Sequence, residues 1–202
     1  MIGRKNSVGD MKRYRERSEK NLELRIAYQG EPGSFSEEAV LQLGLAIPVP
    51  CRSFAELFSA ILDKRADRIL APIDNKIAGA VIECRDLLAQ SDLLTIGEIC
   101  LPIRLHLIGI PGSSSIHIRK VRSHPVALAQ CRCYFEKHPN WIAEPATDTA
   151  GSVREILELG DRSVAAVASE RAATLYGAII LDRDVHENPE NFTRFLLLSA
   201  EQ

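Results

Sequence analysis

The sequence predicts an α/β fold made of two α/β lobes with a cleft between them. From about residue 24, short apolar runs alternate with amphipathic stretches, a pattern typical of sheets that are covered by helices. A long apolar stretch from Leu93 to Ile110, with Pro102 near its centre, divides these elements into two sets. Because proline disfavours a single helix there, the stretch suits two successive extended segments that connect two lobes. The last apolar run, residues 195–198, then returns the chain to the first lobe.

The first lobe is predicted to contain three units, each a strand followed by a helix. In each unit a short apolar run precedes an amphipathic stretch, and Gly44 stops the first of these helices. The expected strands are residues 24–28, 47–51 and 68–73, and the expected helices are residues 36–44, 53–65 and 80–90. With the final strand, these units assign about residues 24–102 and 190–202 to lobe 1.

The second lobe is predicted from the next set of alternating segments, about residues 103–189. Its expected strands are residues 119–124, 141–146, 163–169 and 178–185, and its expected helices are residues 125–138, 149–160 and 170–177. The final strand is expected at residues 192–199. Residues 1–23 are polar and rich in charge, so we expect a flexible arm or a solvated helix there rather than part of either lobe.

The composition narrows the kind of partner. Of the 202 residues, 46% are hydrophobic, which is ordinary for a packed soluble protein, and the formal net charge is -2. No basic stripe runs along the chain, which argues against nucleic acid as the main partner. The first twenty residues are rich in charge, and nothing resembles a secretory signal or a membrane-spanning segment. We therefore expect no membrane association and a cytoplasmic location.

The cysteines do not indicate a metal or redox site. The five are odd in number and scattered, without the C-x-x-C spacing that zinc and disulfide chemistry use. We interpret them as reduced thiols of the core. The sequence therefore predicts no metal, and it indicates a small molecule or a protein as the partner.

Polar residues gather at the junction of the first strand and the first helix, AYQGEPGSFSEEA. Ser34 and Glu37 have the spacing of a capping box, S-x-x-E. Gly30 and Gly33 permit tight backbone turns, and the free N–H groups at a helix start attract anions. The segment is interpreted either as an anion-binding turn to which Gly33 and Ser34 contribute or as an ordinary turn.

A second junction, APIDNKIAGAV, places three consecutive polar side chains in an apolar context: Asp74, Asn75 and Lys76. One interpretation is a turn stabilised by hydrogen bonds of the Asx type. The other is a binding site in which Asn75 offers its amide, and Lys76 a point charge, to a carboxylate.

Two further junctions lie in the second lobe. Ser123 and Gln130 are seven residues apart, so on one helix they would share nearly the same face and one ligand would touch both. His124 precedes a proline, and we interpret it as a structural histidine rather than a base. Thr149 begins the segment TAGSVREI, where Thr or Asp caps a helix and Gly151 permits close approach; capping alone is the other explanation.

The final strand begins with a polar pair, Thr193 and Arg194, at the mouth of an apolar run. Like the four junctions, this pair lies at the end of a strand. Open α/β sheets bind their ligands at such ends. The sequence therefore predicts one ligand site in the cleft, formed by all five segments.

Six ordered segments resemble the signature segments of prephenate dehydratases and of the related arogenate dehydratases. They are AYQGEPGSFSEEA, APIDNKIAGAV, SHPVALAQC, DTAG, AAVASERAATLYG and NFTRFLLL, and the similarity extends from about Arg25 to Ala200. The resemblance implies a fold like that of type-II periplasmic binding proteins, with the substrate in the cleft between the lobes. It also implies a hydro-lyase of phenylalanine biosynthesis, usually a homodimer, that converts prephenate to phenylpyruvate without metal or cofactor.

The resemblance also implies roles for individual residues. Thr193 would donate a hydrogen bond to the departing hydroxyl, and Arg194 would hold its segment or pair with a substrate carboxylate. The other polar pocket positions are matched by Asn75, Ser123, Gln130 and Thr149. Lys76 stands where the family commonly has a small hydroxyl residue, so it either strengthens the binding of a dianion or points outward.

Other functions remain open at this point. Arogenate differs from prephenate only by an amine in place of a keto group, and a prephenate decarboxylase is expected to lack the threonine that is present here as Thr193. A non-catalytic module that closes on a small anion has the same fold. The family's regulatory ACT domain would follow the final strand, so we expect this 202-residue chain either to lack feedback by phenylalanine through such a domain or to be the catalytic part of a longer protein.

Overall fold

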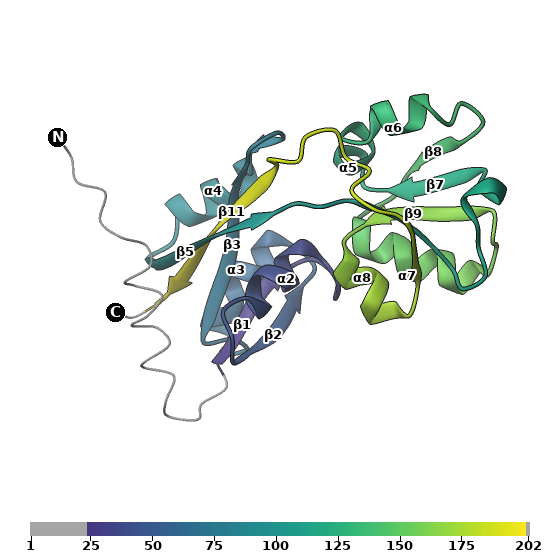
Figure 1. Cartoon of the computed structure of the whole chain (residues 1–202). Helices are drawn as coiled ribbons and strands as arrows, with labels where there is room; N and C mark the ends of the chain where they lie inside the picture. The colour runs from purple at the N-terminus through teal and green to yellow at the C-terminus, as the bar shows by residue number, and fades with distance from the viewer. Residues whose placement is uncertain (1–23, 201–202) are drawn as a thin grey trace.

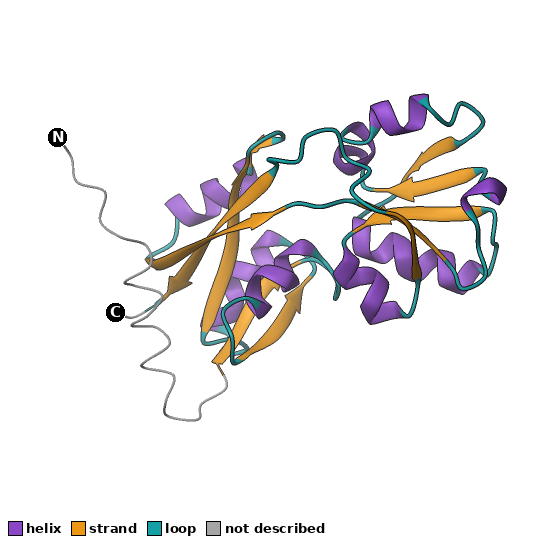
Figure 2. Ribbon diagram, viewed as in Figure 1, coloured by secondary structure: helices purple, strands orange, loops and turns teal. Residues whose placement is uncertain are grey.

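The computed structural model describes residues 24–200, so the arm expected at residues 1–23 lies outside the described residues. The described chain forms two sheets, each flanked by helices (Figures 1 and 2). This arrangement confirms the predicted α/β class with two lobes. None of the helices in residues 24–200 is both long and apolar enough to cross a membrane.

The first sheet has six strands, in the order β2-β1-β3-β11-β5, and the short β4 pairs with β3. Its strands are β1 (Leu24–Gln29), β2 (Ala46–Cys51), β3 (Arg68–Asn75), β4 (Gly79–Ala80), β5 (Leu94–Pro102) and β11 (Phe192–Ser199). Its helices are α2 (Phe35–Leu41), α3 (Phe54–Leu62) and α4 (Ile82–Ala89). The final strand β11 lies between β3 and β5 and is antiparallel to both, so the end of the chain completes the sheet that the beginning started.

The second sheet has five strands, in the order β10-β6-β9-β7-β8. Its strands are β6 (His106–Gly109), β7 (Lys120–Ser123), β8 (Ile142–Pro145), β9 (Val164–Ala168) and β10 (Ile179–Asp182). Its helical segments are η1 (Ser115–His117), α5 (Pro125–Ala129), α6 (Arg132–Glu136), α7 (Thr149–Leu159) and α8 (Glu170–Tyr176). The strand β9 is buried along its whole length, which explains its uninterrupted run of Val and Ala.

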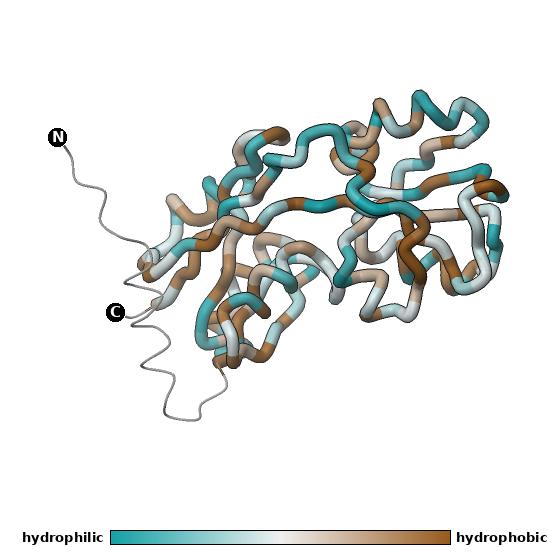
Figure 3. The backbone as a smooth tube through the Cα atoms, in the orientation of Figure 1, coloured by the Kyte–Doolittle hydropathy of each residue, from teal (hydrophilic) through white to brown (hydrophobic). Residues whose placement is uncertain are grey.

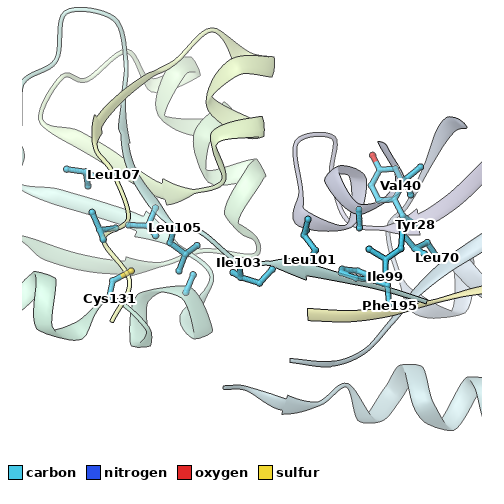
Figure 4. Close-up of a cluster of buried hydrophobic side chains, with 14 of the residues drawn as sticks. Tyr28, Val40, Leu70, Ile99, Leu101, Ile103, Leu105, Leu107, Cys131 and Phe195 are labelled. Carbon is cyan, nitrogen blue, oxygen red and sulfur yellow. The ribbon is translucent and has the colours of Figure 1, made fainter. Parts of the chain in front are cut away.

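Two segments connect the sheets. Residues 103–105 follow β5 directly, as the apolar stretch around Pro102 predicted, and residues 183–191 lead from β10 back to β11 (Figure 1). The first connection carries buried side chains from one lobe into the other: Leu101, Ile103, Leu105 and Leu107 form a row (Figure 4). The second connection is mostly hydrophilic (Figure 3). The apolar core is therefore continuous between the lobes on the side of the first connection.

The helix expected at residues 125–138 is instead two short helices, α5 and α6, that meet at Gln130 and Cys131. The carbonyl of Gln130 accepts a hydrogen bond from the backbone N–H of Glu187, in the second connection. The side chain of Glu187 accepts one from the N–H of Cys133, in the first turn of α6. A distant segment thus satisfies backbone groups that a continuous helix would pair internally.

Candidate active site

A cavity of about 360 Å³ lies between the two lobes. Strand ends, helix starts and the first connection all contribute to its wall. Apolar residues form part of the lining: Phe35, Pro72, Ala78, Ile103, Leu105, Val126, Ala127 and Phe195. Polar residues form most of the rest: Gln29, Glu31, Ser34, Ser36, Asn75, His124, Gln130, Thr147, Asp148, Thr149 and Thr193. The volume is in the range of small-molecule sites in proteins.

Five residues predicted from the sequence line this one cavity: Ser34, Asn75, Gln130, Thr149 and Thr193. They come from both lobes, and up to 159 positions separate them in the chain. These five residues therefore lie together at one cavity between the lobes, as the sequence predicted.

Thr193 and Asn75 are register partners in the antiparallel pair β11 and β3. The amide Nδ2 of Asn75 donates to Oγ1 of Thr193 over 3.0 Å and to the carbonyl of Phe192 over 3.2 Å. Its Oδ1 accepts hydrogen bonds from the N–H groups of Ile77 and Ala78 over 3.0 and 2.8 Å. Because the hydroxyl of Thr193 already accepts a hydrogen bond, its own proton is free to be donated to a ligand in the cavity.

Asn75 therefore makes the Asx-type turn that was one of its two interpretations. Both atoms of its amide are engaged within the protein, so the side chain acts on the cavity mainly through Thr193. The same register explains why the two residues meet, since β11 and β3 run antiparallel and the start of β11 lies beside the end of β3 at the cavity.

The helix α2 begins beside the cavity with a capping box. Oγ of Ser34 accepts from the N–H of Glu37 over 3.3 Å, and Oε2 of Glu37 accepts from the N–H of Gly33 over 2.9 Å. Nε of Arg171, on α8 of the other lobe, also donates to this oxygen over 3.0 Å. The cap thus joins the two lobes as well as starting the helix.

The helix α7 begins on the opposite wall. Asp148 is its N-cap and accepts from the N–H of Gly151 over 2.6 Å. Thr149, the first residue of α7, lines the cavity together with Asp148 and Thr147. The positive end of the helix dipole therefore faces a space that already holds a capping carboxylate.

Two predicted residues face away from the cavity. Successive side chains of a strand point to opposite faces, so Arg194 points away from the side that Thr193 occupies. Its guanidinium binds Asp74, with Nη2 2.7 Å from Oδ2, and lies 3.6 Å from Glu98. Hydrogen bonding from Arg194 lowers the pKa of Asp74 below its ordinary value. Two roles were expected for Arg194, and its contacts with Asp74 and Glu98 agree with the role of holding its own segment in place.

Lys76 does not line the cavity either. Its Nζ lies 2.7 Å from Oε2 of Glu190, and both side chains are substantially exposed. The contact joins the turn after β3 to the second connection. Lys76 thus points outward, which was one of the two alternatives, and the expectation that it binds substrate is not met by its position.

Ser123 and Gly33 have structural positions outside the lining. Ser123 ends β7 rather than lying on a helix, so it shares no helix face with Gln130, and its buried hydroxyl donates to the carbonyl of Val167 over 2.6 Å. Gly33 has a φ of +88°, and a Cβ there would lie 3.0 Å from Cα of Ala172. Gly33 therefore allows the first lobe to approach α8 closely.

Several lining residues were not singled out from the sequence, among them Gln29, Glu31 and Asp148. Gln29 and Glu31 flank Gly30 in the first polar junction, and Asp148 precedes Thr149, so their nearness in sequence to predicted residues was the available signal. His124 also lines the cavity. Its Nδ1 accepts from the N–H of Val126 over 3.2 Å, a capping contact that agrees with a structural role.

The charge of the cavity wall is unusual for a site that binds anions. Among residues 24–200, those that line it include the carboxylates of Glu31 and Asp148 but no Lys or Arg. Glu31 forms an ion pair across the lobes, with Nη1 of Arg154 3.2 Å from its Oε2. Within the same residues, no three His, Cys, Asp or Glu side chains gather in a way that could hold a metal ion.

Two α/β lobes, joined by two connections and with a cavity between them that both polar and apolar residues line, give this chain the architecture of a two-lobed protein with a candidate small-molecule site. The prephenate dehydratase family model matches residues 26–202. The chain therefore belongs to the prephenate dehydratase family.

Relatives and solved structures agree with this family. The chain is 40% identical over 183 residues to arogenate dehydratase 1 of Petunia hybrida, covering 88% of this chain and 42% of that protein. A prephenate dehydratase of Arthrobacter aurescens, solved with L-Phe, is 30% identical with a TM-score of 0.82, covering 89% of this chain and 61% of that one. A structure described as GqqA, a quorum quenching acylase, is 35% identical with a TM-score of 0.81, covering 88% and 64%. The chain spans less than half the length of the curated relatives that it matches.

Proposed function

We propose that this protein is a hydro-lyase that converts prephenate to phenylpyruvate, carbon dioxide and water. Family membership supports this proposal. The observation that carries it is the hydrogen bond from Asn75 to Thr193 in the cavity between the lobes, because it leaves the hydroxyl proton of Thr193 available to a substrate.

The reaction has two bond cleavages. The bond between the ring and its carboxylate breaks and releases carbon dioxide, and its electron pair enters the ring. The bond between the opposite ring carbon and its hydroxyl breaks, and the oxygen leaves with the electrons of that bond. Aromatisation of the ring drives both cleavages, so the enzyme needs to position the substrate and stabilise the departing oxygen.

Thr193 is placed to stabilise that oxygen. An aliphatic hydroxyl is a weak acid, so a hydrogen bond to the departing oxygen is its main contribution, and the departing hydroxide takes up a proton from the solvent to become water. The donor from Asn75 withdraws electron density from Oγ1 and thereby strengthens Thr193 as a donor. A positioned donor of this kind is worth about 10² to 10⁴ in rate.

The remaining wall offers apolar contacts and neutral hydrogen-bond donors to a substrate with a hydrocarbon ring. Phe35, Ile103 and Phe195 offer apolar contact to the ring and limit the access of water. Neutral donors, such as the amide of Gln130 and the hydroxyl of Thr149, are available to carboxylate and keto oxygens.

Arogenate is a second candidate substrate, and one observation favours it. The lining holds the carboxylates of Glu31 and Asp148 and, among residues 24–200, no Lys or Arg. Such a wall suits the ammonium group of arogenate better than the keto group of prephenate, because a carboxylate attracts the ammonium ion. The relative from Petunia hybrida is named an arogenate dehydratase.

One set of assays tests these assignments. The protein is mixed with prephenate and phenylpyruvate is followed by its absorbance in alkali; in parallel, arogenate is supplied and phenylalanine is measured. Product from either substrate supports a dehydratase, and the ratio of kcat/KM values assigns the preferred one. Loss of prephenate without phenylpyruvate would indicate a decarboxylase, and binding of either substrate without turnover would indicate a binding module.

We further propose that the protein acts as a homodimer in the cytoplasm. The resemblance to dehydratases supports the dimer, and the composition of the chain, which is ordinary for a packed soluble protein, agrees with the location. Sedimentation of the purified protein tests the first of these, and fractionation of the cells that produce it tests the second.

A further inference from the structure

Asn191 lies directly behind the cavity wall, at the end of the second connection. Its side chain is only 2% exposed. Its backbone carbonyl accepts a hydrogen bond from the N–H of Ile103, in the first connection, over 2.9 Å. Its side-chain Nδ2 donates to Oε1 of Gln130 over 3.0 Å. Asn191 therefore links both connections to a residue that lines the proposed site.

Gln130 is held at two points by the second connection. Its backbone carbonyl accepts from the N–H of Glu187 over 2.8 Å, and its side-chain Oε1 accepts from Asn191. Its side-chain Nε2 makes no hydrogen bond to any residue from 24 to 200. Because Gln130 lines the cavity and its oxygen is engaged behind the wall, the Nε2 donors remain for a ligand.

We propose that Asn191 is a positioning residue that fixes the carboxamide of Gln130 with its N–H groups, rather than its carbonyl, toward the cleft. The donors then bind an acceptor oxygen of the substrate, either of a carboxylate or of the keto group. This inference rests on the proposed function, since it assigns Gln130 to the binding of an anionic substrate.

The orientation matters because the two ends of an amide have opposite hydrogen-bonding character. A free glutamine can rotate by half a turn and present either end at little cost. Presented wrongly, Oε1 of Gln130 would face a substrate oxygen and repel it. Residues 24–200 contribute no Lys or Arg to the wall, so an anionic substrate depends on neutral hydrogen-bond donors. Fixing the orientation of one such donor therefore has a large effect on the affinity for the substrate.

The Asn191→Asp variant reverses the constraint with almost no change in shape. A carboxylate only accepts hydrogen bonds, so it draws Nε2 of Gln130 toward itself and turns Oε1 toward the cleft. We expect KM for the substrate that the wild type uses to rise by about tenfold or more, the value of a hydrogen bond to a charged group, with a smaller change in kcat.

The pH dependence separates this role from a purely structural one. Burial raises the pKa of the introduced carboxyl group, so it binds a proton as the pH is lowered from 8 to 5.5. The protonated group donates to Oε1 of Gln130, as Asn191 does, and restores the original orientation. The KM of the variant divided by that of the wild type should therefore decrease as the pH is lowered from 8 to 5.5. A defect of folding would leave this ratio unchanged or increase it at the lower pH.

A second variant and a second readout complete the test. Gln130→Leu should raise KM, and adding Asn191→Asp to it should raise KM no further. The side-chain amide NMR signals of Gln130, assigned by their loss in Gln130→Leu, should shift with pH in Asn191→Asp and stay constant in the wild type.

The two failures are distinguishable. If the wild type turns over neither prephenate nor arogenate, the proposed function fails, and the NMR signals still report whether Asn191 orients Gln130. If the wild type is active but Asn191→Asp keeps KM within about twofold at every pH, or its Gln130 signals do not shift, the positioning role is wrong.

Discussion

The side-chain amide of Asn75 donates a hydrogen bond to Oγ1 of Thr193 over 3.0 Å, although 118 positions separate the two residues in the chain. The contact exists because the last strand of the chain, β11, inserts beside β3 with these residues in register. It places a hydroxyl with a free proton in the wall of the cavity between the lobes.

Removing the hydroxyl of Thr193 should disable turnover and leave the fold intact. We expect Thr193→Ala to lower kcat by at least about 10²-fold, because no donor then meets the departing oxygen. Thr193→Ser retains the hydroxyl and should keep much more of the activity. The rates are compared by phenylpyruvate formation and the folds by thermal unfolding; a fully active Thr193→Ala would remove this residue from the mechanism.

Asn75→Asp separates the two roles of the asparagine side chain. A carboxylate still accepts from the N–H groups of Ile77 and Ala78, so the turn should persist. Its other oxygen cannot donate to Thr193, and the threonine hydroxyl would instead donate to it and lose its free proton. We expect kcat to fall by about 10²-fold, and the unfolding temperature to fall as well, because a carboxylate oxygen would replace the amide donor that faces the carbonyl of Phe192. Equal kcat values for the variant and the wild type would contradict this role.

Lys76 should matter little for the substrate. Its ammonium group binds Glu190 at the surface, and it does not line the cavity. We expect Lys76→Ala to leave KM within about twofold of the wild type, as is usual for exposed ion pairs, and Glu190→Ala to behave in the same way. A tenfold or larger rise of KM in Lys76→Ala alone would show that the ammonium group reaches the substrate after all.

The contact between Arg194 and Asp74 should contribute to stability in a manner that depends on pH. The guanidinium lowers the pKa of Asp74 in the folded state, so the stabilisation is present above the carboxyl's unfolded pKa, about 3.9, and is lost as the pH falls through the lower folded value. Both side chains are partly exposed, which limits the effect. We expect Arg194→Gln to lower the free energy of unfolding by about 1 kcal/mol at pH 7 and by less at pH 3.

Urea unfolding at both pH values measures this difference. An equal loss at pH 7 and pH 3 would mean that the ion pair is not the source of the stabilisation. The Arg194→Lys variant retains the charge without the paired donors, so its loss should be smaller than that of Arg194→Gln.

Gly33→Ala should push the lobes apart. The added Cβ would lie 3.0 Å from Cα of Ala172 on α8, at a φ of +88°. Gly44→Ala is a matched control, because Gly44 has a φ of +95° with no atom within 4 Å of the added Cβ. We expect both variants to lose about 1 kcal/mol from backbone strain, and only Gly33→Ala to lose more and to raise KM. Identical losses in urea unfolding and identical KM values would mean that this contact does not set the spacing of the lobes.

Most of the fold could be predicted because its signals are local. The capping box of Ser34 and the N-cap before Thr149 depend on residues within one helical turn, and both helices begin where the sequence placed them, within one residue. The two extended segments around Pro102 are likewise a property of that stretch alone. The prediction of one long helix after Pro125 was wrong. Glu187, far along the chain, makes hydrogen bonds with backbone groups that a continuous helix would pair internally.

The candidate site could be predicted only in part, because facing the cavity is not a local property. Five of the predicted polar residues line the cavity, but the hydroxyl of Ser123 donates its hydrogen bond to the carbonyl of Val167 on the neighbouring strand. Arg194 follows Thr193 and therefore faces the other side of β11. Asn191 could not be found from its sequence position, because its partner Gln130 comes from another lobe.

The sequence by itself determined most of the segments that become strands and helices and the short stretches that are rich in polar residues, because hydrophobic periodicity and capping act over a few neighbouring positions. The tertiary structure alone decided which polar groups are free to meet a ligand. That choice depends on the register of β11 against β3 and on the approach of the lobes, which pair atoms more than 100 positions apart and engage some side chains while leaving others open.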